Sequence, residues 1–341
     1  MSSHAPGEGG KNAPLQITEA EAALYDRQIR LWGLEAQQRM RNATILVLTI
    51  RGLATEVVKN IVLAGVGRLI IADNEDVKGE DLGTGFFFRD EDIGRKRVDA
   101  ARPRVENLNP LVAIEAISSY DDESLVGLIE RVDLVCVTEE TRDNVVRLNE
   151  ICRSLGKKFY AGGIYGLLGY IFCDLQDHEF ISPDRSGKKD AKNLKLTSRF
   201  TSLREALEWK WNLKAKREAK EINPHLVFTL LALWEFQVRH QGELPSQPEQ
   251  VVELESIQGT LISERIANKT LLKGSSKALI ASLSTTAAHE FSPVCAVVGG
   301  VLAQDILNAL SAREAPISNL FVFDGTTGSG HTAMLMNPAS Q

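Results

Sequence analysis

The sequence predicts an α/β protein with a Rossmann-like, mostly parallel sheet that carries helices on both faces, together with a helical insertion. Two observations lead to this fold class. Short apolar runs alternate with amphipathic helical stretches from about residue 43 to residue 162, as is typical of parallel strands buried on both sides. The alternation stops after residue 176 and returns near residue 293, which places the insertion between two parts of one sheet domain.

The chain therefore divides into four segments. The start is rich in Gly, Pro and Ser and predicts a flexible tail. The predicted segments are the tail at 1–17, the first part of the sheet domain at 18–177, the helical insertion at 178–284, and the last part of the sheet domain at 285–341.

Residues 18–33, TEAEAALYDRQIRLWG, predict one helix. Thr18 and Glu21 have the spacing of a capping box at its start, and Gly33 is placed to end it. An apolar stripe follows the helical period along it: Ala22, Tyr25, Ile29 and Trp32.

The elements of the sheet domain follow from the period of the apolar residues. The predicted strands cover 43–49, 68–73, 111–117, 132–138, 157–162 and 319–325, with further extended chain over 162–175. The predicted helices cover 53–65, 95–108, 121–131, 143–155 and 293–310. In the insertion, residues 178–193 predict a polar loop, and helices are predicted over 198–220, 224–240 and 248–270.

Composition limits the partners. The net charge is −6, which argues against a broad surface for nucleic acid or for an anionic membrane. The basic run KWNLKAKREAK is interpreted as a solvated helix face, because Glu208, Glu218 and Glu221 balance it. The four cysteines form no C-x-x-C pair, so no zinc or other metal site is predicted in this chain, and the thiols are expected to be buried and unpaired.

The stretch LTIRGLATEVV, which follows the first apolar strand, lies where a nucleotide-binding loop is expected. Such a loop reads G-x-G-x-x-G, because bare backbone must approach the phosphates. Thr49, Arg51 and Ala54 occupy the three glycine positions, and Gly52 alone remains. Asp73 follows the next strand, about 21 residues later, where an acid binds ribose in dinucleotide folds; a carboxylate there also fits a loop cap.

Several motifs together resemble the activating enzymes (E1) of ubiquitin-like modifiers, in the ThiF/MoeB-like adenylating superfamily. They are YDRQIRLWG, GLATEVVKNIVLAGVGRLIIAD, IGRKRVDAARPRVENLNPLV and FSPVCAVVGGVLAQDILNAL followed by NLFVFDG. Within the superfamily, the chain is most similar to the smaller-subunit family of SUMO-activating enzymes. The resemblance covers roughly residues 18–177 and 285–335, and the length of the chain fits it.

The resemblance implies a heterodimer of two related halves, of which only the larger subunit binds ATP and magnesium. That subunit adenylates the C-terminus of the SUMO-type modifier and then takes it on a cysteine as a thioester, for transfer to an E2 conjugating enzyme. The resemblance also implies a nuclear location.

This chain departs from the pattern of the active half at each aligned position. The Asn-Arg-Gln that helps to hold ATP is missing from residues 73–89, and Arg97 stands where the family has a catalytic lysine. The metal-binding aspartate aligns with Glu140, and Thr141 follows it. We therefore expect that this half does not bind ATP productively and serves as the inactive, pseudo-adenylation half.

In the family, the arginine of the D-R-Q segment crosses the dimer and contacts the ATP phosphates of the partner. That residue is Arg27 here. Arg27 lies about 160° from the apolar stripe at roughly 100° per residue, so it points away from the contact of the helix with its own core. Without the family, a surface salt bridge is the simpler role. Arg30, one turn along, is a second and lesser candidate.

Three alternatives stay open. In the first, the chain is the regulatory half of an E1 for another modifier, although that relative normally carries a longer insertion. In the second, it is a bacterial-type adenylating homodimer, which the lost glycines and absent zinc cysteines disfavour. In another class, it is an NAD-dependent oxidoreductase, which needs G-x-G-x-x-G and a proton-relay residue. The histidines show no motif for that role: His4, His178, His225, His240, His289 and His331.

Overall fold

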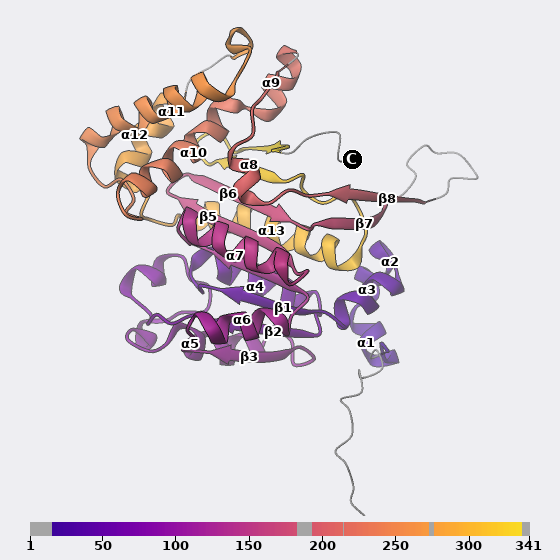
Figure 1. The fold of residues 1–341 in the computed structure, drawn as a ribbon. Coiled ribbons are helices and arrows are strands. Elements are labelled where there is room, and N and C mark those ends of the chain that lie inside the picture. The colour runs from indigo at the N-terminus through magenta and orange to yellow at the C-terminus, as the bar shows by residue number, and fades with distance from the viewer. Residues whose placement is uncertain (1–15, 183–192, 214, 273–275, 336–341) are drawn as a thin grey trace, which may run out of the picture.

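The computed structural model describes residues 16–182, 193–213, 215–272 and 276–335. Most of the predicted tail at 1–17 lies outside these residues. The core is an eight-stranded sheet with the strand order β10-β9-β6-β5-β4-β1-β2-β3 (Figure 1). The predicted α/β class with a mostly parallel sheet is confirmed.

Five strands form the parallel part of the sheet. They are β1 (Thr44–Leu48), β2 (Arg68–Ala72), β3 (Ala113–Ile117), β4 (Leu134–Thr138) and β5 (Lys158–Tyr165). The connecting helices are α4 (Gly52–Leu63), α5 (Arg97–Glu106), α6 (Asp122–Glu130) and α7 (Arg142–Ser154), with the short 3-10 turns η1 (Gly79–Gly83) and η2 (Asp90–Asp92) after β2. Each predicted strand and helix of this part exists within a few residues of its predicted bounds.

An antiparallel part extends the sheet. β6 (Leu168–Asp174) pairs with β5 and with β9 (Leu320–Asp324), and β10 (Ser329–Ala333) closes that edge. Gly166 makes the β5–β6 turn at φ 59°, a backbone conformation that favours glycine. After the insertion, the chain thus returns to the sheet at β9, beside β6.

The two faces of the sheet bury separate cores. Alternate residues of β1 point to opposite sides: Ile45 and Val47 join one core, and Leu46 and Leu48 join the other. The first core lies under α4, α5 and α13 (Ser292–Ser311). The second lies under α6, α7 and α10 (Pro224–Arg239). Strands buried on both faces must be apolar at every position, which explains their continuous apolar runs.

α13 has the length and apolar composition of a membrane-spanning helix, but 67% of its most apolar window is buried inside the protein. It packs along α4 and against β5 and β6. Its composition therefore follows from its place in the core.

Two predictions in the insertion are wrong. The polar loop predicted from residue 178 is in part a strand, because β7 (Asp177–Ser182) pairs antiparallel with β8 (Leu194–Arg199). His178 and Phe180 are buried while Asp177 and Glu179 are exposed, so the signal was a short period-2 pattern. The helix predicted over 198–220 is also interrupted, because only α8 (Leu203–Leu207) and α9 (Lys216–Ile222) are helical.

The break between α8 and α9 has a tertiary cause. The backbone N–H of Trp211 donates to Arg265 O (2.7 Å), and Trp211 O accepts from the backbone N–H of Ala267 (3.1 Å). This segment is therefore extended beside the end of α11 (Val251–Arg265). The remaining elements are helical, as predicted for 224–240 and 248–270: α10, η3 (Pro248–Gln250), α11 (Val251–Arg265), η4 (Lys269–Leu271) and α12 (Lys277–Thr286). The proposed domain boundaries at 178 and 284 stay a prediction.

The N-terminal helix is also split. The capping box of Thr18 and Glu21 is present, but α1 (Glu19–Leu24) and α2 (Asp26–Trp32) are separate, and Gly33 at φ 91° leads into α3 (Leu34–Arg41). Tyr25, at the break, is buried, and its OH accepts a hydrogen bond from Asn109 Nδ2 (2.8 Å). The anchored tyrosine fixes the turn that the helical period did not show.

Candidate functional site

A ligand site is expected at the carboxyl end of β1. β1 lies between β2 and β4, and the chain moves outward from β1 through β2 and β3 before it returns to β4. Where the strand order reverses in this way, a crevice forms outside the carboxyl ends of the two central strands. Residues 49–52 cross that point and lead into α4. We call this loop and the side chains around it the loop crevice.

Thr49, at the first glycine position of the loop, keeps a backbone conformation that glycine favours. Its φ is 65°, in the left-handed region that a β-branched residue rarely adopts. Thr49 O accepts from Thr138 Oγ1 (2.7 Å), and Thr49 Oγ1 donates to Glu140 Oε1 (3.2 Å). The loop therefore retains the turn of a phosphate loop at this residue, held by side chains.

Gly52 and Ala54 are small for packing reasons that the structure makes visible. A Cβ added at Gly52 would lie 2.5 Å from Thr84 Oγ1 and 3.0 Å from Glu290 Oε1, so a larger residue does not fit without movement. Ala54 is fully buried in the first turn of α4. At both positions, neighbouring atoms of the chain occupy the space that a larger side chain would need.

Glu290 places a carboxylate at the N-terminus of α4. Its Oε2 accepts from the backbone N–H of Gly52 (3.0 Å), and its Oε1 accepts from the backbone N–H of Leu53 (2.8 Å). The side chain is only 4% exposed. The free N–H groups of a helix start and the helix dipole bind anions, and this is the place where a phosphate binds in nucleotide folds. An internal carboxylate occupies it here.

Arg51, at the second glycine position, pairs with the same carboxylate. Arg51 Nε lies 3.5 Å from Glu290 Oε2 and 3.7 Å from Asp81 Oδ1, and its Nη2 lies 3.5 Å from Glu80 Oε1. Burial acts to lower the pKa of Arg51, but these carboxylates, with Glu139, outweigh it and raise that pKa above its ordinary value. Arg51 therefore neutralises the internal anion.

Arg97, where the family has a catalytic lysine, is not available to a ligand. It is 3% exposed. Its Nε and Nη2 donate to the two carboxylate oxygens of Asp81 (2.9 and 3.3 Å), and its Nη1 donates to Asp73 Oδ2 (3.4 Å). A buried guanidinium held by a two-pronged pair is a fixed structural group.

The other predicted site residues also have partners within the chain. Asp73 accepts from the backbone N–H of Ile50 (2.7 Å) and of Glu75 (2.8 Å), which is the geometry of a loop cap. Glu140 Oε2 accepts from Asn144 Nδ2 (2.8 Å), and Thr141 is the N-cap residue of α7. Whether Asp73 or Glu140 contacts any ligand stays a prediction.

Glu139 adds a further carboxyl group to the loop crevice. It has a left-handed φ of 55°, and its Oε1 accepts from the backbone N–H of Ile164 (2.8 Å). Burial and, after it, the nearby Glu290 carboxylate raise the pKa of Glu139 well above the usual carboxyl value. Sequence reasoning missed both Glu139 and Glu290. Glu290 lies 237 residues from Leu53 along the chain, and a single acid at that distance carries no local signal.

The loop crevice is thus acidic, and the helix start within it is occupied by Glu290. The carboxyl groups that meet the loop come from the residues just after β2 and β4, from η1 and from the segment just before α13. They outnumber the guanidiniums of Arg51 and Arg97. A triphosphate brought here would meet like charge and an occupied helix start. Among the described residues, no cluster of three or more acidic, His or Cys side chains is arranged to hold a metal.

Arg27 and Arg30 do not belong to this crevice. α3 leads directly into the start of β1, so α2 and α3 lie at the amino end of the strand, and Figure 1 shows α1, α2 and α3 together at one end of the sheet. The ring of Tyr25 packs on Gly65, just beyond the C-terminus of α4. The 12 residues of α4 span roughly 18 Å, so Arg27 lies at the end of the molecule opposite to the crevice.

The surroundings of the two arginines differ. Arg30 Nε lies 2.9 Å from Asp26 Oδ2, and both side chains are exposed. Arg27 is exposed and makes no ion pair with the described residues. α2 buries no residue, and Leu31 (77% exposed), one turn beyond Arg27, and Leu34 (55%) in α3 face solvent near it. Large exposed leucines beside an unpaired arginine are typical of surfaces that other proteins cover.

Comparison with known proteins identifies the family. A family model described as ThiF family matches residues 25–341. The chain belongs to the ThiF family. Its relatives include the SUMO-activating enzyme subunit 1 of Xenopus tropicalis, which is 36% identical over 336 residues (92% of this chain and 95% of the relative). The SUMO-activating enzyme subunit 1 of Homo sapiens is 36% identical over 335 residues, with the same coverage. That of Danio rerio is 37% identical over 335 residues (92% and 94%).

Solved structures agree on the fold. PaaA has a TM-score of 0.58 at 12% identity, covering 97% of this chain and 78% of its own. MccB of E. coli has a TM-score of 0.55 at 14% identity, covering 93% and 73%. The ThiF/MoeB-like fold and the resemblance to SUMO-activating enzymes are confirmed. Membership in the ThiF family leaves the NAD-dependent oxidoreductase without support.

Proposed function

We propose that this chain is the non-catalytic subunit of a heterodimeric, ATP-dependent SUMO-activating enzyme. In this proposal, the larger subunit binds ATP and magnesium, adenylates the C-terminus of the SUMO-type modifier, and takes it on a cysteine before an E2 accepts it. This chain supplies the dimer scaffold and Arg27. The relatives named SUMO-activating enzyme subunit 1 support it, since they match along nearly their whole length.

The observation that carries the proposal is the carboxylate of Glu290 at the start of α4. Two backbone N–H groups bind it, and Arg51 neutralises it. A helix start that is already bound to an internal anion offers no cradle to a phosphate. We therefore expect the isolated chain to bind neither ATP nor NAD, and to be inactive without its partner.

Arg27 fits its proposed role by chemistry and by place. Its guanidinium stays charged and presents a planar fork that pairs with phosphate oxygens. Because it lies exposed at the end away from its own crevice, it is free to enter a site on another subunit. There it would stabilise charge that develops on the α-phosphate and on the leaving pyrophosphate. Arginines supplied in trans accelerate related phosphoryl transfers by about 10³–10⁵.

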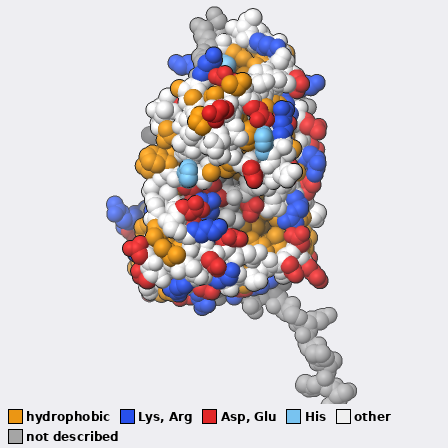
Figure 2. Space-filling view, turned by 90° about the vertical axis from the view of Figure 1, so that its left-hand side faces the viewer, with side chains coloured by type: hydrophobic (Ala, Val, Ile, Leu, Met, Phe, Trp, Pro, Cys, Tyr) orange, Lys and Arg blue, Asp and Glu red, His pale blue; other side chains and the backbone are white. Residues whose placement is uncertain are grey.

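The surface fits a protein partner. On the face shown in Figure 2, acidic and basic side chains of the described residues are interspersed, without a continuous basic area. With a net charge of −6, we propose a protein partner rather than nucleic acid or an anionic membrane. We place the complex in the nucleus, as the resemblance implies.

Co-expression with a tag on this chain tests the proposal. We expect a larger subunit with a reactive cysteine to co-purify, identified by mass spectrometry. The purified pair should catalyse pyrophosphate exchange with ATP and a SUMO-type modifier, and the tagged chain alone should not. Nucleotide binding by the isolated chain in equilibrium dialysis with magnesium and ATP would contradict the proposal, as would modifier activation without a second subunit.

A further inference from the structure

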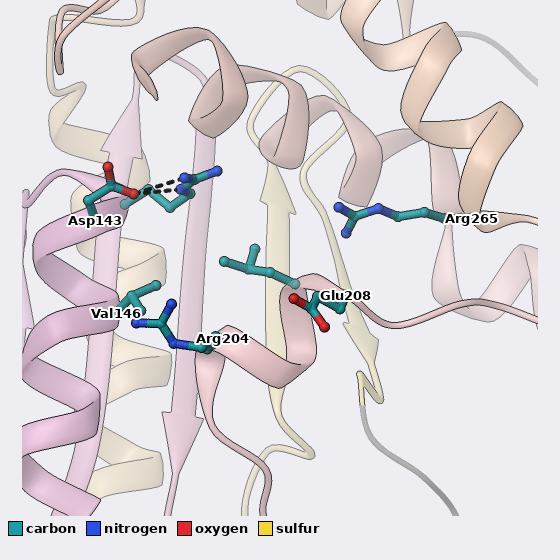
Figure 3. A pocket seen from close by; sticks show the side chains of 7 residues that line it. Asp143, Val146, Arg204, Glu208 and Arg265 are labelled. Atoms are coloured by element: carbon teal, nitrogen blue, oxygen red, sulfur yellow. Dashed lines mark hydrogen bonds and ion pairs between the residues drawn. The ribbon is translucent and has the colours of Figure 1, made fainter. Parts of the chain in front are cut away.

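We propose that the open cavity between α7, α8 and the end of α11 binds a single phosphate or carboxylate group carried on an apolar stem, such as a phosphorylated or acidic side chain of a protein partner. The cavity has a volume of about 380 Å³. Arg142, Arg204 and Arg265 line it, each from a different helix, together with Asp143, Val146, Leu207 and Glu208 (Figure 3). We call it the arginine pocket. It is separate from the loop crevice and from Arg27.

Arg265 is the group that calls for a ligand. It is half-buried, and its guanidinium makes no hydrogen bond or ion pair with the described residues. In Figure 3 it extends from one side of the opening toward the middle. Burial, with the nearby Arg142 charge, lowers its pKa despite the surrounding carboxylates. A cation withdrawn from water without a partner is unfavourable, and an incoming anion relieves that cost.

The backbone fixes Arg265 in this position. Its carbonyl accepts the N–H of Trp211 (2.7 Å), in the bridge that interrupts the predicted helix between α8 and α9. Trp211 itself is buried. The end of α11 is therefore anchored to the insertion, and Arg265 is held at the pocket by tertiary structure.

The other two arginines are positioned by carboxylates outside the centre of the pocket. Arg204 forms a two-pronged pair with Glu150, including an Nη2–Oε2 contact of 2.9 Å, while its side chain remains 62% exposed. Arg142 pairs with Asp143 (2.9 Å) and Glu235 (3.4 Å). A guanidinium has five N–H donors, so each keeps donors for a ligand.

The charged and apolar residues of the arginine pocket limit which ligands can bind there. Arg142 pairs with Asp143 and Glu235. Arg204 pairs with Glu150, which leaves Arg265 as the one lining guanidinium without an ion pair among the described residues. One such guanidinium suits a group with one or two negative charges and disfavours a polyanion such as nucleic acid. Val146 and Leu207 add an apolar wall, which suits a stem as well as an anionic head.

Binding of phenyl phosphate and of inorganic phosphate to the full chain tests the inference. The shift of the unfolding temperature is measured against probe concentration, with chloride balancing the ionic strength. We expect both probes to stabilise the chain, and phenyl phosphate to bind more tightly because its ring contacts the apolar wall. No shift with either probe, or equal affinities, would overturn the proposal.

Matched variants locate the site. Arg265→Met keeps the aliphatic stem and removes the charge, and we expect it to weaken binding about tenfold or more, the loss of a charged hydrogen bond. Arg131→Met removes an exposed arginine that pairs with Glu115 on another surface and should change nothing. Glu208→Gln removes an opposing carboxylate and should tighten binding about three- to fivefold. Equal binding by the Arg265 and Arg131 variants, or no gain with Glu208→Gln, contradicts the assignment.

Discussion

At the carboxyl end of β1, the arginines that stand in the family's ligand positions are bound by carboxylates of the same chain. Arg51 pairs with Glu290 and Arg97 with Asp81. At the amino end, α2 holds Arg27 in solvent beside the exposed Leu31. The comparison teaches that the chain has two kinds of arginine site. Internal ion pairs stabilise one end, and at the other end Arg27 is left without an ion pair among the described residues, as a residue that acts on a partner must be.

Arg97→Met should have the largest effect on folding. The substitution leaves Asp81 and Asp73 buried without their cation, and breaking a buried pair on one side costs about 3–5 kcal/mol. Urea unfolding of the isolated chain measures it. A loss below about 1 kcal/mol would show that the crevice network is not structural.

Arg27→Ala sharpens the comparison from the other end. In the complex with the larger subunit, we expect pyrophosphate exchange to fall by about 10²–10³, while assembly and the unfolding temperature of the isolated chain stay the same. Arg30→Ala is the matched control, because its exposed pair with Asp26 should contribute little. Unchanged exchange at saturating ATP would remove Arg27 from the mechanism.

Glu290→Gln tests the internal anion directly. The amide keeps the size of the side chain but cannot match both backbone N–H groups and the charge of Arg51. We expect a loss of about 1–3 kcal/mol in the free energy of unfolding. Arg51→Met measured alone and with Glu290→Gln completes a double-mutant cycle. Strict additivity in the cycle would mean that the two side chains do not act together.

Glu139→Gln should change how stability depends on pH. The folded-state pKa of Glu139 is raised, so the folded chain binds its proton more tightly than the unfolded chain does. The contribution of Glu139 to the free energy of unfolding is complete when the pH is below the ordinary carboxyl pKa of 4.5. It decreases as the pH rises toward the raised pKa of Glu139 in the folded chain. The variant lacks this decrease, so its stability relative to wild type should increase with pH. Urea unfolding of wild type and variant at pH values from about 5 to about 8 measures how the free energy of unfolding depends on pH. If the two proteins show the same dependence, the raised pKa of Glu139 is contradicted.

Thr49→Gly should have the smallest effect. Glycine relieves the left-handed φ of 65°, but it loses the bond to Glu140 and gains freedom in the unfolded chain. We expect a net change within about 1 kcal/mol and no ATP binding by dialysis, because Glu290 still fills the helix start. If ATP did bind, the lost glycine rather than the internal carboxylate would be what closes the crevice.

Much of the sheet domain was predictable because its signals are local. A strand buried on both faces must be continuously apolar, and a capped helix must show its cap, as Thr18 and Glu21 do. The predictions failed where distant contacts override local preference. Tyr25 splits one helix because Asn109 and Gly65 hold its ring, and Trp211 is extended because it pairs with the end of α11.

The sequence by itself determined the order of strands and helices from β1 to β5, the loss of the loop glycines and the resemblance to an inactive half, since each is written in neighbouring residues. Only the tertiary structure decided what fills the emptied loop and where Arg27 lies relative to it. Glu290 reaches Gly52 from 238 positions away, and the opposite ends of α4 separate Arg27 from the crevice. Contacts between residues so far apart arise because α13 packs along α4, and the spacing of apolar residues within either helix does not show which helices pack together.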